Sequence, residues 1–294
     1  TESGAAKLLD AYCPHLGAHL GHGGSVHGES VACPFHGWQF NGDGVCTSVP
    51  YATNMPPKTQ QGACIAHYPV VEQNYLVWAW YHPEGAEPLW DVEAMPELNS
   101  SDWNKPNRFE WDFNSCIQET GENGVDIAHF LYVHSAREMP TADITLEGHR
   151  RMTKMTSMAP AINDNGQVDT TGDNWTRFKL TTSNYGPGMT YQIFDRGFAA
   201  VMMGTVTPID EDRVHMRWLF ANTKTQDEMK KLFFEGFMAE TVRQVGQDIP
   251  IWQHKIYQAN PILCDGDGPI AKYRKWFAQF YSGEKTAPLG VVGE

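Results

Sequence analysis

The first 82 residues alternate apolar and polar positions over short runs, and turn-forming residues separate these runs. Asn41-Gly42 and Gln73-Asn74 are two such turns. None of the runs has helical spacing, whereas alternation with a period of two is typical of strands. The pattern therefore predicts a small all-β domain over residues 1–85. Its strand candidates are residues 7–12, 26, 31–32, 38–40, 64–71 and 75–81.

A different pattern begins near residue 90. Some segments still alternate as strands do, but others carry apolar side chains every three or four residues, which is typical of helices. Antiparallel strands flanked by helices make an α+β domain, which we predict over residues 86–294. The strand candidates are 108–114 and 147–222, with turns at 163–166, 172–174 and 186–188, and the helix candidates are 115–135, 227–257 and 270–281.

Charge and composition narrow the class of protein. The 294 residues include 22 basic and 35 acidic ones, and the net charge of −13 argues against nucleic acid or an anionic membrane surface as a partner. The apolar run 75–81 is too short to cross a bilayer, and no signal-peptide pattern opens the chain. We therefore expect a cytoplasmic protein. Because a domain rarely begins one strand before its metal site, we also expect residues upstream of Thr1, and a membrane anchor there stays an alternative.

Two cysteine–histidine pairs lie close together, and they are near-copies of one another. These pairs are Cys13-Pro-His15 and Cys33-Pro-Phe-His36, and glycine is frequent around both. Two thiolates and two imidazoles can bind zinc or complete a [2Fe–2S] cluster with mixed ligands. The repeated pairs suit a cluster in which one iron takes two thiolates and the other takes two imidazoles. A zinc finger would place its histidines on a helix, and this stretch has no helical pattern.

A second set of metal-binding side chains lies in residues 121–134. Asp126 and His129 are three positions apart and share a helix face, whereas His129 and His134 are five apart and do not. The helix must therefore kink or end between the two histidines. Two imidazoles and one carboxylate form the facial triad of non-haem Fe(II) oxygenases. The alternative is a pair of core histidines in an amphipathic helix.

The first stretch is similar to the signature of the Rieske ferredoxins. Cys13-x-His15 is followed after 17 residues by Cys33-x-x-His36-Gly-Trp. The resemblance implies that these four residues bind a Rieske-type [2Fe–2S] cluster. It also leaves open a purely electron-carrying protein, which would need no second iron site.

The second stretch resembles the iron motif of the Rieske non-haem iron oxygenases, Asn123-x-x-Asp126-x-x-His129-x4-His134. The resemblance implies a mononuclear Fe(II) held by the two histidines and by an aspartate far downstream. It further implies that Asp126 links His129 to the cluster ligand His36 of a neighbouring subunit, and therefore a homotrimer. Asn123 is expected to approach the iron.

The position that matches the downstream ligand is Asp248, in the sequence Gln247-Asp-Ile-Pro-Ile-Trp252. Asp210 and Asp212 are alternatives, but they lie in an expected hairpin turn. We therefore predict that Asp248 completes the iron site.

The resemblance covers nearly the whole chain and is strongest to the steroid-acting members, the oxygenase component of 3-ketosteroid 9α-hydroxylase and the cholesterol 7-desaturases. Residues 10–18, 128–134 and 251–255 are among the similar stretches. It implies a helix-grip-like catalytic domain and hydroxylation of a hydrophobic, steroid-like substrate. Desaturation is the first alternative, and an aromatic acid, a methyl ether or a quaternary amine are alternative substrates.

Electrons must come from another protein, because the sequence has neither a Rossmann glycine motif in a strand–helix context nor a plant-type ferredoxin cysteine run. The partner implied is a separate NAD(P)H-dependent flavin/iron–sulfur reductase or a ferredoxin. The substrate pocket should be apolar, whereas an acidic substrate would require a buried arginine or lysine. Candidate pocket walls are Tyr185, Met189, Tyr191, Phe194, Met202, Met203, Trp218 and residues 233–237, and candidate arginines are Arg177, Arg196, Arg213 and Arg217.

Overall fold

The computed structural model describes residues 1–161, 174–195 and 198–282. The chain divides into two compact units, Thr1–Ala94 and Met95–Glu294. The boundary at residue 85/86 stays a prediction. The predicted turn at 163–166, and residues 172–173 of the predicted turn at 172–174, lie outside the described residues. No helix in the described ranges is both long and apolar enough to cross a membrane. The cytoplasmic location also stays a prediction.

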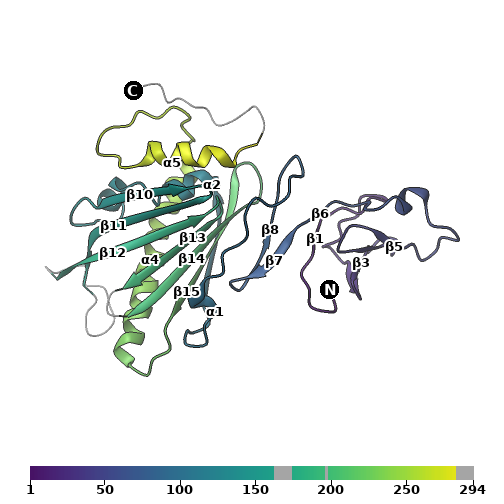
Figure 1. The fold of residues 1–294 in the computed structure, drawn as a ribbon, viewed down its shortest axis with the longest axis horizontal. Coiled ribbons are helices and arrows are strands. Elements are labelled where there is room, and N and C mark those ends of the chain that lie inside the picture. The colour runs from purple at the N-terminus through teal and green to yellow at the C-terminus, as the bar shows by residue number, and fades with distance from the viewer. Residues whose placement is uncertain (162–173, 196–197, 283–294) are drawn as a thin grey trace. The chain divides into compact units, whose positions relative to one another are not determined.

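The N-terminal unit is built from short antiparallel strands, as its alternating sequence predicts (Figure 1). Four strands form one sheet in the order β2-β3-β4-β5, and two further pairs, β1-β6 and β7-β8, form ribbons. Apolar side chains and three cysteines make one core, which includes Leu20, Phe40 and Ile65. The elements are β1 (Leu8–Leu9), β2 (Ser25–His27), β3 (Ser30–Ala32), β4 (Gln39–Asn41), β5 (Cys46–Ser48), the 3-10 helix η1 (Pro57–Gln60), β6 (His67–Tyr68), β7 (Val70–Gln73) and β8 (Leu76–Ala79).

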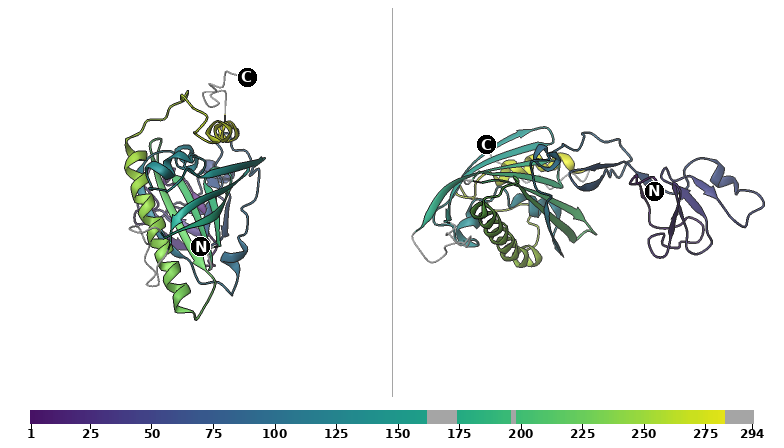
Figure 2. Two further views of the ribbon diagram at one scale, coloured as in Figure 1. Left: turned by 90° about the vertical axis from the view of Figure 1, so that its left-hand side faces the viewer. Right: turned by 90° about the horizontal axis from the view of Figure 1, so that it is seen from below.

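The C-terminal unit has one large antiparallel sheet with helices, which confirms the α+β class. Its seven strands have the order β10-β11-β12-β13-β14-β15-β9, so the first long strand, β9, closes the edge beside β15. The long helix α4 runs along one face of this sheet (Figure 2). The strands are β9 (Asn107–Asn114), β10 (Thr141–Glu147), β11 (Arg150–Pro160), β12 (Trp175–Tyr185), β13 (Met189–Asp195), β14 (Ala199–Pro208) and β15 (Arg213–Asn222). The helices are α1 (Pro96–Asn99), α2 (Ile117–Glu122), α3 (Ala128–Tyr132), α4 (Glu228–His254), α5 (Ile270–Phe277) and the 3-10 helix η2 (Ala278–Phe280).

Helix α4 is positioned by its cap and by one buried stripe. The Asp227 carboxylate accepts hydrogen bonds from the backbone N–H groups of Met229 and Lys230, which satisfies free donors of the first turn. The side chains that α4 buries recur at spacings that keep them on one face, and Asp248 is the one charged member of this set. Its carboxylate is therefore turned toward the protein interior. The buried residues are Phe234, Phe237, Val245, Asp248 and Trp252.

The segment 115–135, which the sequence predicts as one helix candidate, is not one continuous helix. It forms the two short helices α2 and α3, with residues 123–127 between them. The Asp126 carboxylate accepts hydrogen bonds from the backbone N–H groups of Ala128 and His129, at 3.0 and 3.2 Å, and so starts a new helix. Helix α3 then ends at Tyr132. The prediction that a helix ends between His129 and His134 is therefore confirmed.

Candidate metal centres

The two cysteine–histidine loops of the N-terminal unit have the same backbone hydrogen bonds. The Cys13 carbonyl accepts from Gly17 N at 2.9 Å, and the Cys33 carbonyl accepts from Gly37 N at 3.0 Å. Both glycines have positive φ, +76° and +69°, a conformation that costs other residues energy. Both cysteines also donate their N–H to the carbonyl five residues on, at 2.8 Å. The two loops are thus structural copies, as their sequences are.

The side chains of these loops fit a mixed-ligand cluster. Cys13 and Cys33 are buried and free, not joined in a disulfide. Burial, together with the neighbouring Cys33 thiol, raises the pKa of Cys13 in the protein without a metal. The His15 and His36 rings are 4.8 Å apart, and the buried Nδ1 of His36 has no hydrogen-bond partner among the described residues. A buried imidazole nitrogen without a partner is costly unless it binds something, and a cluster iron would provide that bond.

In the C-terminal unit, His129, His134 and Asp248 come together from three separate segments. One ligand atom from each lies within 4.8 Å of the others. His129 lies on α3, His134 follows its end, and Asp248 faces them from α4. His134 Nε2 is 3.3 Å from Asp248 Oδ1, and this carboxylate is only 8% exposed. Two imidazoles and a buried carboxylate in this arrangement can hold an Fe(II) ion and leave coordination positions open.

Hydrogen bonds on the far side of each ring orient the two histidines. The Nδ1 of His129 is 2.6 Å from the backbone carbonyl of Asp126, and the Nδ1 of His134 is 3.0 Å from Gln247 Oε1. Both partners are acceptors, so each Nδ1 carries the proton and donates. Each Nε2 therefore points toward the triad and is the ring nitrogen available to a metal.

The pKa values of these two histidines shift in opposite directions because their surroundings differ. Burial lowers the pKa of His129. Burial acts in the same direction on His134, but its hydrogen bond to Asp248 and the charge of that carboxylate outweigh it, so the pKa of His134 is raised.

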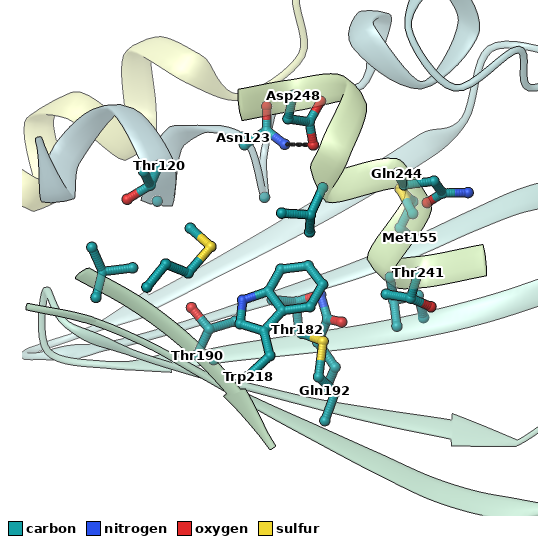
Figure 3. Close-up of a pocket in the computed structure, with 18 of the residues that line it drawn as sticks. Thr120, Asn123, Met155, Thr182, Thr190, Gln192, Trp218, Thr241, Gln244 and Asp248 are labelled. Carbon is teal, nitrogen blue, oxygen red and sulfur yellow. Dashed lines mark hydrogen bonds between the residues drawn. The ribbon is translucent and has the colours of Figure 1, made fainter. Parts of the chain in front are cut away.

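Asn123 and Asp126 occupy different places around the triad. The Nδ2 of Asn123 is 3.2 Å from His129 Nε2 and 3.2 Å from Asp248 Oδ2, so its amide lies against the ligand atoms (Figure 3). The carboxylate of Asp126 does not bond to His129 Nδ1, because its Oδ1 is 3.9 Å away and the backbone carbonyl takes that place. About a third of this side chain, 32%, is exposed.

The alternative aspartates lie elsewhere. Asp210 and Asp212 are exposed in the β14–β15 hairpin, where Asp210 pairs with Arg213 at 3.2 Å. The geometry thus brings Asp248, and neither alternative, to the histidines.

A cavity of about 210 Å³ adjoins the triad. Figure 3 shows Asn123 and Asp248 on the helical side of this cavity, with Thr182, Thr190 and Gln192 on the sheet below. Among the predicted wall residues, four line the cavity: Phe194, Met202, Trp218 and Phe237. Tyr185, Met189, Tyr191, Met203 and Phe233 are not among the residues that line it.

The period of the strands explains which predicted walls were wrong. Alternate residues of a strand point to opposite faces, so Gln192 and Met202 face the cavity whereas Tyr191 and Met203 face the other side. The Tyr191 hydroxyl instead donates to Glu97 of α1 at 2.7 Å. Hydrophobicity alone does not distinguish the two faces of a strand.

The cavity is lined by an arginine, Arg151, that is not among the four candidate arginines. Arg151 is 1% exposed, whereas Arg177 is exposed and pairs with Glu138. Arg213 and Arg217 pair with acidic residues outside the cavity, and Arg196 lies outside the described residues. The alternation along β11 could have indicated Arg151, because residues four positions apart on a strand lie on the same face and Met155, four positions on, is apolar and buried.

Two protein families match most of the chain. The Rieske [2Fe-2S] domain family matches residues 1–69, and the family described as 3-Ketosteroid 9alpha-hydroxylase C-terminal domain matches residues 79–281. A cholesterol 7-desaturase of Caenorhabditis elegans is 33% identical over 96% of this chain and 69% of its own length. A probable 3-ketosteroid-9-alpha-monooxygenase, oxygenase component, of Rhodococcus rhodochrous is 33% identical over 95% of this chain and 71% of its own length.

The chain spans 64–69% of the length of three cholesterol 7-desaturases that it matches.

Among solved structures, NdmA of Pseudomonas putida CBB5 with caffeine superposes with a TM-score of 0.70 at 17% identity, over 92% of this chain and 77% of the other. Dicamba monooxygenase with 3,6-dichlorosalicylic acid gives a TM-score of 0.67 at 15% identity, over 93% of this chain and 86% of the other. These likenesses show a shared fold. The chain belongs to the Rieske non-haem iron oxygenases with a C-terminal domain of the 3-ketosteroid 9α-hydroxylase type, and the [2Fe–2S] cluster and mononuclear iron that its sequence predicts are the cofactors of that family.

Proposed function

We propose that this chain is an oxygenase component that uses O₂ and electrons from a separate protein to hydroxylate a hydrophobic, steroid-like substrate. The observation that carries the proposal is the meeting of His129, His134 and Asp248 at the wall of a largely apolar cavity. Such a cavity suits an apolar substrate with few polar groups. The relatives named for steroid oxidation support the choice of substrate class.

The three ligand side chains would hold Fe(II), which supplies the binding and activation of O₂ when it is bound. The rest of the chain positions and shields that site. Gln247 and the Asp126 carbonyl hold the two rings by their Nδ1 atoms, so each Nε2 is the nitrogen that a metal would take, and the Asn123 amide holds Asp248. The apolar walls exclude water and hold a substrate C–H bond beside the open side of the triad.

Cys13, His15, Cys33 and His36 would hold the cluster, and mixed ligation raises its reduction potential so that it accepts electrons readily. Those electrons would come from an NAD(P)H-dependent flavin/iron–sulfur reductase or a ferredoxin. We further propose a homotrimer in which the Asp126 carboxylate contacts His36 of the partner subunit. The partly exposed carboxylate of Asp126 supports this contact, because only its Oδ1 is engaged by α3.

Desaturation is the second candidate reaction, since several relatives are named cholesterol 7-desaturase. Iron-loaded protein would be supplied with a reductase, NADH, O₂ and a panel of steroids, and product masses would be measured. A gain of one oxygen supports hydroxylation, and a loss of two hydrogens supports desaturation. An Asp248→Ala variant should form neither product, and reducible wild-type protein that converts no steroid would refute the substrate class.

A pure electron carrier is tested separately by iron content. An oxygenase needs three irons per chain, two in the cluster and one in the triad, whereas a carrier needs only two. Protein that retains two irons after reconstitution with excess Fe(II) would support the carrier.

A further inference from the structure

A row of polar side chains crosses the sheet on the cavity side. Arg151 of β11 lies opposite Asn184 of β12, and Asn184 lies opposite Thr190 of β13. The next row toward the hydrophobic core pairs Thr153 with Thr182. Because residues directly opposite one another share a face, these side chains form one polar patch that three adjacent strands carry.

Hydrogen bonds hold this patch in a fixed arrangement. The Asn184 carbonyl oxygen accepts from both Nε and Nη2 of Arg151, and the Asn184 amide donates to Thr190 Oγ1 at 2.9 Å. Arg151 Nη1 donates to Thr153 Oγ1 at 3.2 Å. A guanidinium has five N–H donors, so three are engaged and one on each Nη atom has no partner among the described residues.

The charge of Arg151 is also uncompensated. The described part of the chain pairs no carboxylate with this guanidinium, and the titratable group beside it is the ring hydroxyl of Tyr273, whose pKa is raised by burial, so that it is neutral at neutral pH. Burial lowers the pKa of Arg151 to about 10, so the side chain stays protonated at neutral pH. Its guanidinium carbon lies 5.3 Å from the centre of the Tyr273 ring, which offsets only part of the cost of burying a cation.

This cation lies at the cavity that the triad adjoins. Arg151, Thr182, Thr190 and the three triad residues all line it. Arg151 also reaches the backbone next to Asn123, because a Cβ added at Gly124 would lie 3.0 Å from its Nη2. In Figure 3, Thr182 and Thr190 lie across the cavity from Asn123 and Asp248.

The rest of the cavity wall differs from this polar patch. It is mainly apolar, and no second arginine and no lysine is among the described residues that line the cavity. The carboxylate of Glu240, which also lines it, is paired with Arg243 at 2.6 Å. A ligand that filled the cavity would therefore meet one unpaired positive charge with two free donors. The apolar lining residues include Met155, Phe178, Leu180, Phe194, Met202, Trp218 and Phe237.

We infer that Arg151, held by Asn184 and Thr153, binds the carboxylate of an amphiphilic substrate whose apolar body occupies the rest of the cavity. A carboxylate offers two acceptor oxygens to the two free N–H groups and also neutralises the buried charge. A keto or hydroxyl oxygen could accept a hydrogen bond but would leave the cation uncompensated. This inference rests on the proposed function, since it specifies the substrate class of the same site.

The first test compares matched ligands on the wild-type holoprotein. Calorimetric titration would use a steroid carboxylate and a naphthoate, each beside its methyl ester. The carboxylate is expected to bind about 10- to 100-fold more tightly than its ester, the range for hydrogen bonds to a charged group. Equal binding of acid and ester, or binding of neither acid, would overturn the inference.

The second test changes the protein. Arg151→Gln should remove the preference for acid over ester, and Arg151→Lys should restore part of it because it keeps the charge. Arg177→Gln is the matched control, since Arg177 is an exposed arginine on the neighbouring strand β12. If Arg151→Gln does not fold, Arg151→Lys and the wild-type ligand pairs still decide. An unchanged preference in a folded Arg151→Gln protein would contradict the inference.

Binding and turnover together separate this inference from the proposed function. Arg151-dependent binding of the acids without any oxidised product would support the carboxylate site and refute the proposed oxygenase reaction on these substrates. Oxidation of neutral steroids by a protein that shows no preference for acids would support the proposed oxygenase reaction and refute the carboxylate site.

Discussion

The two metal-ligand sets of this chain are assembled in different ways. The cluster ligands come from two loops within residues 13–36, each closed by its own pair of backbone hydrogen bonds. The triad instead joins His129 and His134 to Asp248, which is distant in sequence and is held by the packing of α4. Local hydrogen bonds shape the first set, whereas tertiary packing shapes the second. Substitutions in one unit should therefore leave the other unit's metal in place.

The largest effect should follow from removing one ligand of the triad. Asp248→Ala should abolish turnover and lower the iron content by one per chain, because the two histidines alone do not hold the metal tightly. The visible absorption of the cluster should be unchanged. Cys33→Ala should give the opposite pattern, with the cluster lost and iron retained in the triad. Loss of both metals in either variant would show that the two sites depend on each other.

The next effect tests the packing of α4. Trp252 is buried and stacks on Phe113 of β9, with ring centres 5.3 Å apart, one helical turn beyond Asp248. Trp252→Ala should cost about 3–5 kcal/mol in the free energy of unfolding of the C-terminal unit and weaken iron retention. Chemical denaturation followed by far-UV circular dichroism measures the change. The neighbouring Ile251, 48% exposed, gives the control Ile251→Ala, which should be nearly silent.

A smaller effect should come from the orientation of His134. Gln247→Leu removes the acceptor for His134 Nδ1 and should lower iron affinity about 10- to 100-fold, without loss of the fold. Titration of metal-free protein with Fe(II) under anaerobic conditions measures it. Gln247→Glu keeps an acceptor oxygen and should restore most of the affinity, so weak binding in both variants would argue against an orienting role.

In the cluster loops, Gly37→Ala should cost about 1–2 kcal/mol, since the new residue must adopt φ near +69° and its Cβ would lie 3.3 Å from Pro50. The melting temperature of the cluster, followed by visible absorption, should fall. Gly246→Ala in α4, where an added Cβ meets nothing within 4 Å, is the control in the other unit. Equal shifts of the cluster melting temperature in the two variants would contradict the local account.

The smallest effect should be on the pH dependence of unfolding, through Glu110 on the edge strand β9. Arg217 and Arg108 hydrogen-bond to the Glu110 carboxylate and lower its pKa to about 2. A carboxyl with a depressed pKa stabilises the fold above its ordinary pKa of 4.5, and this contribution is lost as the pH falls from about 4.5 to about 2. Glu110→Gln should therefore flatten the pH dependence of unfolding in this range, by a modest amount because the pair is solvent-screened. The exposed Glu235→Gln should not, and an identical pH profile for both would refute this origin.

The sequence predicts most where chemistry is local. The copied loops around Cys13 and Cys33 and the interruption of the helix before His134 follow from spacing and turn residues. The cavity walls were predicted less well, because which strand residues face inward depends on the register of neighbouring strands. Arg151 shows this directly, since its neighbour Arg150 is chemically identical but lies on the outer face. That Arg151 has no carboxylate partner in the described part of the chain follows from the folded packing and has no local signal in the sequence.

The main-chain bond from Asp126 to His129 has a consequence for how this site can evolve. The carbonyl that fixes the histidine belongs to the backbone, so no substitution at position 126 deletes it. A new side chain at that position would remove the two hydrogen bonds by which the Asp126 carboxylate starts α3, but the main-chain acceptor for His129 would remain. One residue therefore makes two separable contributions to the iron site, and a substitution there removes only one of them.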